Sequence, residues 1–190
     1  MPTCSDADPL PHLPNRVLVA GASGAGKTTL ARRIPKALGI AHVEIDALFH
    51  GPGWVTRPSF REDVDQFTEQ PQWVTEWQYD EVRALLVARA DTLVWLDLPR
   101  RTVMARVTSR TIGRRLRREQ LWNGNTEPHL VTVFTDRDHI IRWAWRTYRR
   151  TEYLVAQASI QNPSLTVVRL RTQHEVDSWI AGPLANVAKS

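Results

Sequence analysis

A glycine-rich stretch at residues 21–29 constrains this chain more than any other feature. It follows a short apolar run and leads into a helix-forming segment. Four residues occupy the fixed positions of the pattern G-x-x-x-x-G-K-[ST], namely Gly21, Gly26, Lys27 and Thr28. This spacing, between a buried strand and a helix, predicts a loop whose backbone wraps a chain of phosphate groups.

Each residue type in this loop has a physical reason. Backbone N–H groups approach phosphates closely only where no Cβ intervenes, which explains the glycines. The Lys27 ammonium adds positive charge beside the last two phosphates, and the Thr28 hydroxyl is an oxygen ligand that suits Mg²⁺. We therefore expect ATP and Mg²⁺ as cofactors; the alternative is a flexible glycine turn, which the spacing disfavours. The expected ATP contacts are Gly21, Ala22, Ser23, Gly24, Ala25, Gly26, Lys27, Thr28 and Thr29.

Apolar runs and helical segments alternate along the chain. The runs show little period-two alternation, which is typical of strands buried on both faces of a parallel sheet. The expected strands cover residues 16–20, 42–46, 73–76, 92–97 and 165–170. The expected helices cover residues 27–38 with a kink at Pro35, 59–70, 80–88, 99–112, 136–158 and 172–182. This alternation predicts a doubly wound α/β domain.

Length and composition are those of one ordinary globular domain. The chain has 190 residues, of which 42% are hydrophobic and 24% charged, and it has no apolar run near the ~20 residues that cross a bilayer. Cys4 is the single cysteine, so an internal disulfide is impossible and a reducing cytoplasm is the expected location. We expect an N-terminal tail at 1–15, a main domain at 16–182 with a lid at about 111–130, and a C-terminal tail at 183–190.

Three acidic residues, Asp46, Glu76 and Asp97, end expected strands. In parallel α/β sheets the ligand binds beyond the carboxyl ends of the strands, so these residues are placed near the loop. We expect Glu76 to order the magnesium shell through water. We expect Asp46 to accept the proton of an acceptor hydroxyl, or to orient that hydroxyl. The alternative for each acid is a helix cap or an ion pair.

Arginine dominates the positive charge of the chain. The formal net charge is +5, and eight of the 25 basic residues lie in the segment 100–118, which contains no acidic residue. Arg106 and Arg110 are four residues apart, so they share one helix face and could contact one phosphate chain. We expect both to stabilise charge on a migrating phosphoryl group. For the outer arginines a solvated basic face is the better interpretation.

A further set of residues is expected to contact the acceptor. Arg83 stands alone in an otherwise apolar helical segment soon after Glu76. Trp54, Trp77 and Tyr79 lie in loops near strand ends, where an aromatic ring could stack on a ligand, although packing beneath a loop explains each of them equally well. The six histidines show no metal-ligand spacing and receive no role.

These residues resemble the P-loop kinases of the adenylate kinase and shikimate kinase type. The resemblance is closest to the small bacterial proteins called topology modulation or FlaR-like proteins, and it covers roughly residues 16–181. The segments that carry it are 21–28, 45–48, 52–54, 94–99 and 121–127, together with Tyr79 and Arg83.

The resemblance implies a three-layer α/β/α P-loop fold with a short arginine-rich lid. Its sheet would have five parallel strands in the order 2-3-1-4-5, and Glu76 would hold the Walker B position. Arg106 and Arg110 would match lid arginines that contact nucleotide phosphates. The chain departs from the family where Glu76 and Trp77 replace the usual Asp-Gly pair, because an indole there crowds an approaching adenylate.

The sequence as a whole predicts an ATP- and magnesium-dependent phosphotransferase. Its acceptor would be a small molecule, such as a nucleotide or a nucleoside, and no membrane partner is expected. The alternative is a nucleotide-regulated protein that binds nucleic acid through the basic helix at 100–118. No recognisable nucleic-acid-reading module accompanies that helix, which weighs against the alternative.

Overall fold

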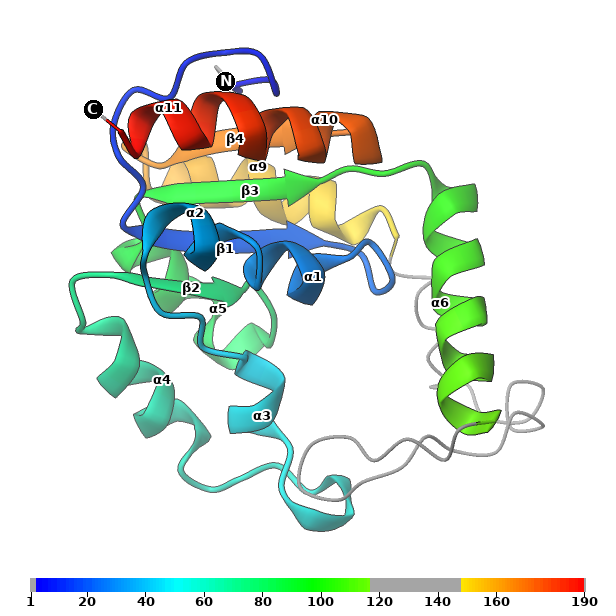
Figure 1. Cartoon of the computed structure of the whole chain (residues 1–190). Helices are drawn as coiled ribbons and strands as arrows, with labels where there is room; N and C mark the ends of the chain where they lie inside the picture. Colours follow the sequence, from blue (N-terminus) through cyan, green and yellow to red (C-terminus); the bar gives the residue numbers. More distant parts are fainter. Residues whose placement is uncertain (1–2, 117–147, 190) are drawn as a thin grey trace.

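The computed structural model describes residues 3–116 and 148–189, and side chains up to residue 113 in the first of these ranges. Within them the chain forms one sheet with helices on both faces (Figure 1). Residues 117–130, which are the larger part of the expected lid, lie outside the described residues. No helix in the described ranges is both long and apolar enough to cross a membrane.

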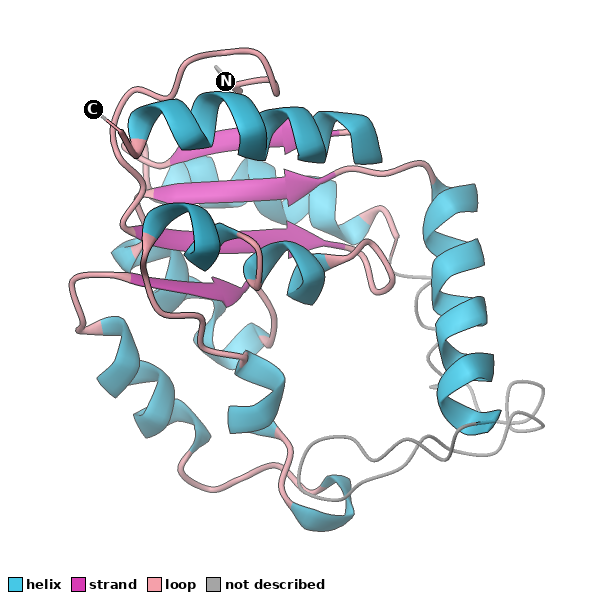
Figure 2. Cartoon of the chain, in the orientation of Figure 1, coloured by secondary structure: helices cyan, strands magenta, loops and turns pink. Residues whose placement is uncertain are grey.

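Four parallel strands form the centre of the molecule (Figure 2). They are β1 (Arg16–Gly21), β2 (Trp73–Glu76), β3 (Thr92–Leu96) and β4 (Thr166–Leu170). Their order is β2-β1-β3-β4, and the register places Val19 beside Glu76 on one side and Val94 on the other. Because the strands are parallel, their carboxyl ends meet at one edge, where the glycine-rich loop leaves β1.

The expected strand at 42–46 is wrong, and the described part of the sheet has four strands rather than five. Only one bridge remains there, in which the Val43 N–H donates to the Val74 carbonyl at 2.9 Å. The chain then enters helix α3 (Ile45–Phe49), whose Ile45 N–H donates to the Glu76 carboxylate at 3.3 Å. That carboxylate satisfies a helix-terminal N–H and so favours a helix over a longer strand. The remaining strand order is as predicted.

Side chains on the two faces of the sheet form two separate cores. The first core contains Val17 and Val94, and the second contains their chain neighbours Leu18 and Leu93, as strand geometry requires. Helices beside the first core are α1 (Lys27–Ala31), α2 (Ile34–Leu38) and α10 (Gln173–Trp179), continued by η3 (Ile180–Leu184) and α11 (Ala185–Val187). Helices beside the second core are α3, α4 (Phe60–Thr68), α5 (Asp80–Arg89) and α9 (Arg150–Gln161), with η1 (Pro52–Trp54) between α3 and α4. The predicted α/β class with a parallel sheet is confirmed.

Local sequence explains several helix boundaries. The expected helix at 27–38 is two helices, α1 and α2, because Pro35 has no N–H to donate and is best placed in a first helical turn. The Thr172 hydroxyl accepts from the Glu175 N–H at 3.0 Å and begins α10, as the capping-box spacing predicts. The helix expected to stop before Pro183 continues through it as a π-helical turn.

Helix α6 (Arg100–Leu116) crosses the carboxyl edge of the sheet, apart from the helices on the two faces (Figure 1). Gly24 of the glycine-rich loop lies directly against it, with φ of 88°. A Cβ on Gly24 would come within 2.9 Å of the Val103 carbonyl oxygen and 3.0 Å of the Val107 Cβ. The loop and α6 therefore pack closely only because this residue has no side chain.

We expect Gly24→Ala to lower the free energy of unfolding by about 3 kcal/mol, since it combines a left-handed backbone with a clash. Gly39→Ala is the matched control, because Gly39 also has a positive φ, 71°, but nothing lies within 4 Å of its added Cβ. That variant should lose only about 1 kcal/mol. Urea denaturation of both variants measures the difference, and equal losses would show that the contact with α6 contributes nothing.

Candidate active site

The loop between β1 and α1 buries a lysine at the carboxyl edge of the sheet. Gly26 is the N-cap of α1 and has φ of 101°, a conformation that favours glycine. Lys27 follows it with 9% of its surface exposed, and its Nζ lies 3.4 Å from the Ala22 carbonyl oxygen. Burial lowers the pKa of Lys27 to about 8, although Asp46 and Glu76 nearby act in the opposite direction. The loop thus holds a poorly solvated cation that an incoming phosphate would stabilise.

Glu76 ends β2 beside this loop, and its side chain is fully buried. One carboxylate oxygen lies 3.2 Å from His42 Nε2, and the other accepts from the Ile45 N–H. Burial opposes the charged form, but the hydrogen bonds and the charge of His42 prevail and keep the pKa of Glu76 below its usual value. The sequence assigns no role to His42, because only the bridge between residue 42 and β2 brings it to Glu76.

The Thr28 hydroxyl and the Glu76 carboxylate are the oxygen donors that could serve a magnesium ion here. In the part of the chain that the structure describes, no group of three His, Cys, Asp or Glu side chains could hold a metal ion. Magnesium in nucleotide sites takes one or two protein oxygens and completes its shell with phosphates and water. Thr28 would supply one such oxygen, and Glu76, whose two oxygens already contact His42 and the Ile45 N–H, would act on a magnesium ion through water.

Asp46 lies in the first turn of α3, so the expectation that it ends a strand is wrong. It still lies close enough to the loop that its charge and that of Lys27 shift one another's pKa. The Tyr79 hydroxyl donates to Asp46 Oδ1 at 2.6 Å, and the Gln78 amide donates to the same oxygen at 2.8 Å. Burial raises the pKa of Asp46, and the bond from Tyr79 and the charge of Lys27 counteract this effect. Gln78 was not expected at the site.

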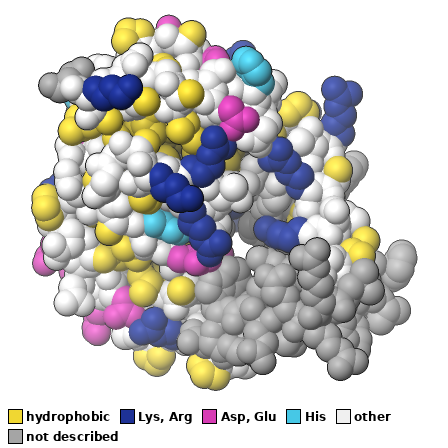
Figure 3. All heavy atoms as spheres, in the orientation of Figure 1, with side chains coloured by type: hydrophobic (Ala, Val, Ile, Leu, Met, Phe, Trp, Pro, Cys, Tyr) yellow, Lys and Arg dark blue, Asp and Glu magenta, His cyan; other side chains and the backbone are white. Residues whose placement is uncertain are grey.

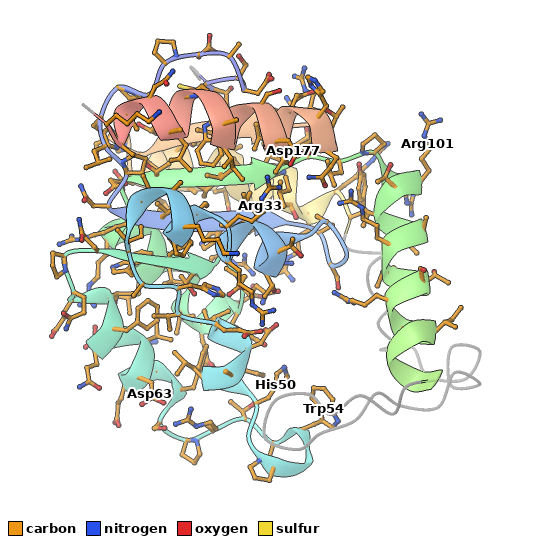
Figure 4. All side chains as sticks on the ribbon, in the orientation of Figure 1. Arg33, His50, Trp54, Asp63, Arg101 and Asp177 are labelled. Atoms are coloured by element: carbon orange, nitrogen blue, oxygen red, sulfur yellow. The ribbon has the colours of Figure 1, made fainter. Side chains whose placement is uncertain are left out.

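Aromatic rings pack around Asp46. The Tyr79 ring stacks on Phe49 with centroids 3.8 Å apart, and its hydroxyl lies 3.2 Å from His50 Nε2. Trp54 meets His50 edge to face with ring centroids 4.9 Å apart and is 39% exposed. The two residues lie near each other in Figure 4. Among the described residues other than glycine, Tyr79 and Trp54 are the two with positive φ, 60° and 63°. Backbone strain is therefore concentrated around Asp46, as is common at functional sites.

The other two expected acceptor contacts, Trp77 and Arg83, belong to the α5 side. Trp77 is 4% exposed in the second core, so it leaves little surface for a ligand, and its contact with the acceptor stays a prediction. The Arg83 guanidinium lies 5.0 Å from the Trp77 ring and pairs with Asp80, which also pairs with Arg150 of α9. These residues border a groove of about 220 Å³. The charge of Arg83 also reaches Lys27, whose pKa it helps to lower.

A larger cleft, of about 300 Å³, opens on the other side of the loop between α1, α6 and α10. Arg106 and Arg110 line this cleft together with the glycine-rich loop. The structure therefore brings both arginines to the loop, as the sequence predicts. Arg106 donates to the Ala25 carbonyl at 3.3 Å and to Gln173 Oε1 at 3.0 Å. Lys and Arg side chains gather on this face between the sheet and α6 (Figure 3). The cleft has the basic lining that a phosphate chain requires.

The rim of this cleft contains residues that the sequence analysis did not single out. Arg33 lines the cleft and pairs with Asp177 at 2.7 Å (Figure 4). Gln173 and Val176 line it from α10. Their position follows from the fold, because α10 begins just after the carboxyl end of β4, the edge where ligands of parallel sheets bind.

Asp97, the third acid expected at a strand end, has a different environment. Its carboxylate accepts from Arg169 Nε at 2.9 Å, and the same guanidinium lies 4.5 Å from the Trp95 ring. An ion pair with an arginine was the alternative considered for this position. Asp97 is thereby engaged in an ion pair with Arg169 of β4.

Comparison with known proteins extends the description of the fold. No family model matches the chain. The chain is 50% identical over 38 residues to a cytidylate kinase from Oleidesulfovibrio alaskensis, a match that spans 20% of this chain and 17% of that relative.

Solved structures match over most of the chain. A shikimate kinase from Bacteroides thetaiotaomicron aligns with a TM-score of 0.51 and 15% identity, over 88% of this chain and 95% of that one. A gluconokinase from Sinorhizobium meliloti aligns with a TM-score of 0.48 and 18% identity, over 94% and 95% of the two chains. The likeness to the Bacteroides protein shows that the α/β fold and parallel sheet of this chain are of the shikimate kinase P-loop type.

Proposed function

We propose that the chain is an ATP- and magnesium-dependent kinase that transfers a phosphoryl group to a hydroxyl of a small acceptor. The observation that carries the proposal is the placement of Lys27 at the start of α1, Glu76 at the end of β2 and Asp46 in the first turn of α3, where Asp46 and Glu76 act on the pKa of Lys27 and Lys27 acts on that of Asp46. A buried lysine, a carboxylate kept ionised and a second carboxylate with an oxygen available are the groups that phosphoryl transfer to a hydroxyl requires.

We place the nucleotide in the larger cleft and across the glycine-rich loop. The loop N–H groups and Lys27 would hold the phosphate chain, and Arg106 and Arg110 would approach it from α6. Gln173 and Val176 are then available to the base and sugar at the far rim. Thr28 and Glu76 would hold the magnesium ion, Glu76 through water, and the ion would neutralise charge on the phosphates.

The acceptor would bind on the opposite side of Lys27, near Asp46. In the reaction a bond forms between the acceptor hydroxyl oxygen and the terminal phosphorus, and the bond from that phosphorus to the bridging oxygen breaks, which releases ADP. Asp46 accepts the hydroxyl proton and later returns it to solvent. Trp54 and Tyr79 border this region, and Arg83 supplies positive charge from α5.

The finer identity of the acceptor also belongs to this proposal. The short stretch shared with a cytidylate kinase and the resemblance to the topology modulation group favour a nucleotide or a nucleoside. Trp77 fills the position beside Glu76, where its indole would crowd an adenylate. Adenylate is therefore disfavoured as the acceptor.

The placement of the nucleotide predicts that Arg106→Ala weakens binding of Mg·ATP by about tenfold or more, since a charge-assisted contact with phosphate is lost. Arg101→Ala is the matched control, because Arg101 lies on the same helix but is exposed and points away from the sheet (Figure 4). It should leave the affinity unchanged in isothermal titration calorimetry. Unaltered affinity in Arg106→Ala would remove this residue from the nucleotide site.

The proposed reaction predicts a product heavier by one phosphoryl group when the protein is incubated with ATP, magnesium and a pool of nucleosides, nucleotides and other hydroxylated metabolites. Mass spectrometry detects this product. Asp46→Asn should slow its formation by about 10²-fold or more, because the proton acceptor is lost, while ATP binding persists. Lys27→Ala should abolish it.

The same proteins distinguish the kinase from the nucleic-acid alternative. The kinase proposal would be contradicted if the protein binds duplex DNA tightly, if this binding falls steeply with salt and persists in Lys27→Ala, and if no acceptor is phosphorylated.

A further inference from the structure

Tyr79 has a backbone conformation that its residue type disfavours. With φ of 60° and ψ of 113°, it joins the end of β2 to the start of α5. A glycine would take this conformation without strain, whereas a residue with a Cβ needs compensating contacts. The connection is short and tightly held, because the Trp77 N–H still donates to the Val19 carbonyl at 2.9 Å and α5 begins at Asp80.

The compensating contacts of Tyr79 come from α3 and α4. Its ring stacks on Phe49 and meets Phe60 edge to face with centroids 5.3 Å apart. Its hydroxyl reaches both Asp46, in the first turn of α3, and His50, which follows the last residue of that helix. The strained residue is therefore the bridge between the loop after β2 and the helix that carries Asp46.

The direction of the Tyr79 hydroxyl proton follows from its two partners. An ionised carboxylate can only accept, so the single hydroxyl proton is used in the 2.6 Å bond to Asp46 Oδ1. His50 Nε2, at 3.2 Å, must then carry its own proton and donate to the Tyr79 oxygen. This arrangement keeps the tyrosine hydroxyl directed at Asp46.

The two oxygens of Asp46 have different surroundings. Oδ1 accepts from both Tyr79 and Gln78. Oδ2 accepts no hydrogen bond from any group in the described part of the chain. The neighbours therefore fix the rotation of the carboxylate and leave one oxygen for a hydroxyl that approaches from the side of Lys27.

We propose that Tyr79 is a positioning residue that orients Asp46, rather than a group that contacts the acceptor. This inference rests on the proposed role of Asp46 as the proton acceptor. The sequence analysis placed Tyr79 in direct contact with the acceptor, so the two roles make different predictions.

The charges that face Asp46 set the direction of the effect. Burial and Glu76 of β2 raise its pKa, while the Tyr79 hydroxyl, Lys27 of α1 and His50 at the C-terminal end of α3 lower it. Removal of the hydroxyl leaves the other groups in place, so the pKa of Asp46 rises. Because the reaction needs ionised Asp46, the rate increases with pH through this pKa, and its acidic limb moves to higher pH.

The test uses Tyr79→Phe, which keeps the ring stack and the Cβ and removes only the hydroxyl. Tyr153→Phe is the matched control, because Tyr153 lies on α9, is 64% exposed and also loses one hydrogen-bonded hydroxyl. Carbon-13 NMR of the aspartate carboxylates in the full chain follows the titration of Asp46. Its signal is assigned as the one that disappears in Asp46→Asn. We expect Tyr79→Phe to raise this pKa by about one unit and Tyr153→Phe to leave it unchanged. If the pKa of Asp46 is the same in Tyr79→Phe as in the wild-type protein, the inference is overturned.

Kinetics on the same proteins separate this inference from the proposed function. With Mg·ATP and water as the acceptor, Tyr79→Phe should lower kcat about tenfold on the acidic limb of the pH profile, leave KM for ATP unchanged and shift that limb with the NMR value. A fall in kcat with no shift of that limb would contradict a role through Asp46. If the wild-type protein phosphorylates no acceptor in the metabolite pool while the NMR shift is present, the kinase proposal fails and the coupling of Tyr79 to Asp46 stands.

Discussion

The structure depends on the burial of opposite charges together at one edge of the sheet. Lys27 is 9% exposed and Glu76 is fully buried, and each lies where removal from water alone would cost several kcal/mol. They are tolerated because Glu76 accepts hydrogen bonds from two sides and because Lys27 faces two carboxylates. The polyanionic ligand and metal ion that we propose would complete this balance.

The packing of α6 extends this edge into a nucleotide cleft. Gly24 lets the α6 backbone approach the glycine-rich loop, and the same helix then presents Arg106 beside Ala25 and Gln173. One small residue thus couples the loop that wraps phosphates to the helix that supplies positive charge. The basic character of α6 has a structural explanation at Arg106 and Arg110, which line the cleft, whereas Arg101 is exposed.

Sequence reasoning succeeded where the determinants are local. The glycine-rich loop, the strand ending at Glu76, the capping box at Thr172 and the alternation of strands and helices are each encoded within a few residues. It failed at residues 42–46, where β propensity was overridden by a tertiary contact, the hydrogen bond from the Ile45 N–H to Glu76. The roles of His42, His50 and Gln78 arise from contacts about 30 residues apart in the chain, which no spacing rule reveals.

This contrast separates the two halves of the proposed site, because the loop proposed for the nucleotide is encoded locally and the region proposed for the acceptor is not. The nucleotide half uses backbone geometry that one continuous segment provides, and every ligand of that class presents the same phosphates. The acceptor half is assembled from α3, η1 and the turn before α5, and it includes strained residues, Trp54 and Tyr79, held by packing against α3 and α4. Strain persists only where the surrounding structure over-determines it, so the shape of this half is set by contacts between segments. Acceptor specificity is therefore a property of the assembled fold, and it can change with Trp54 or Tyr79 while the phosphate loop stays the same.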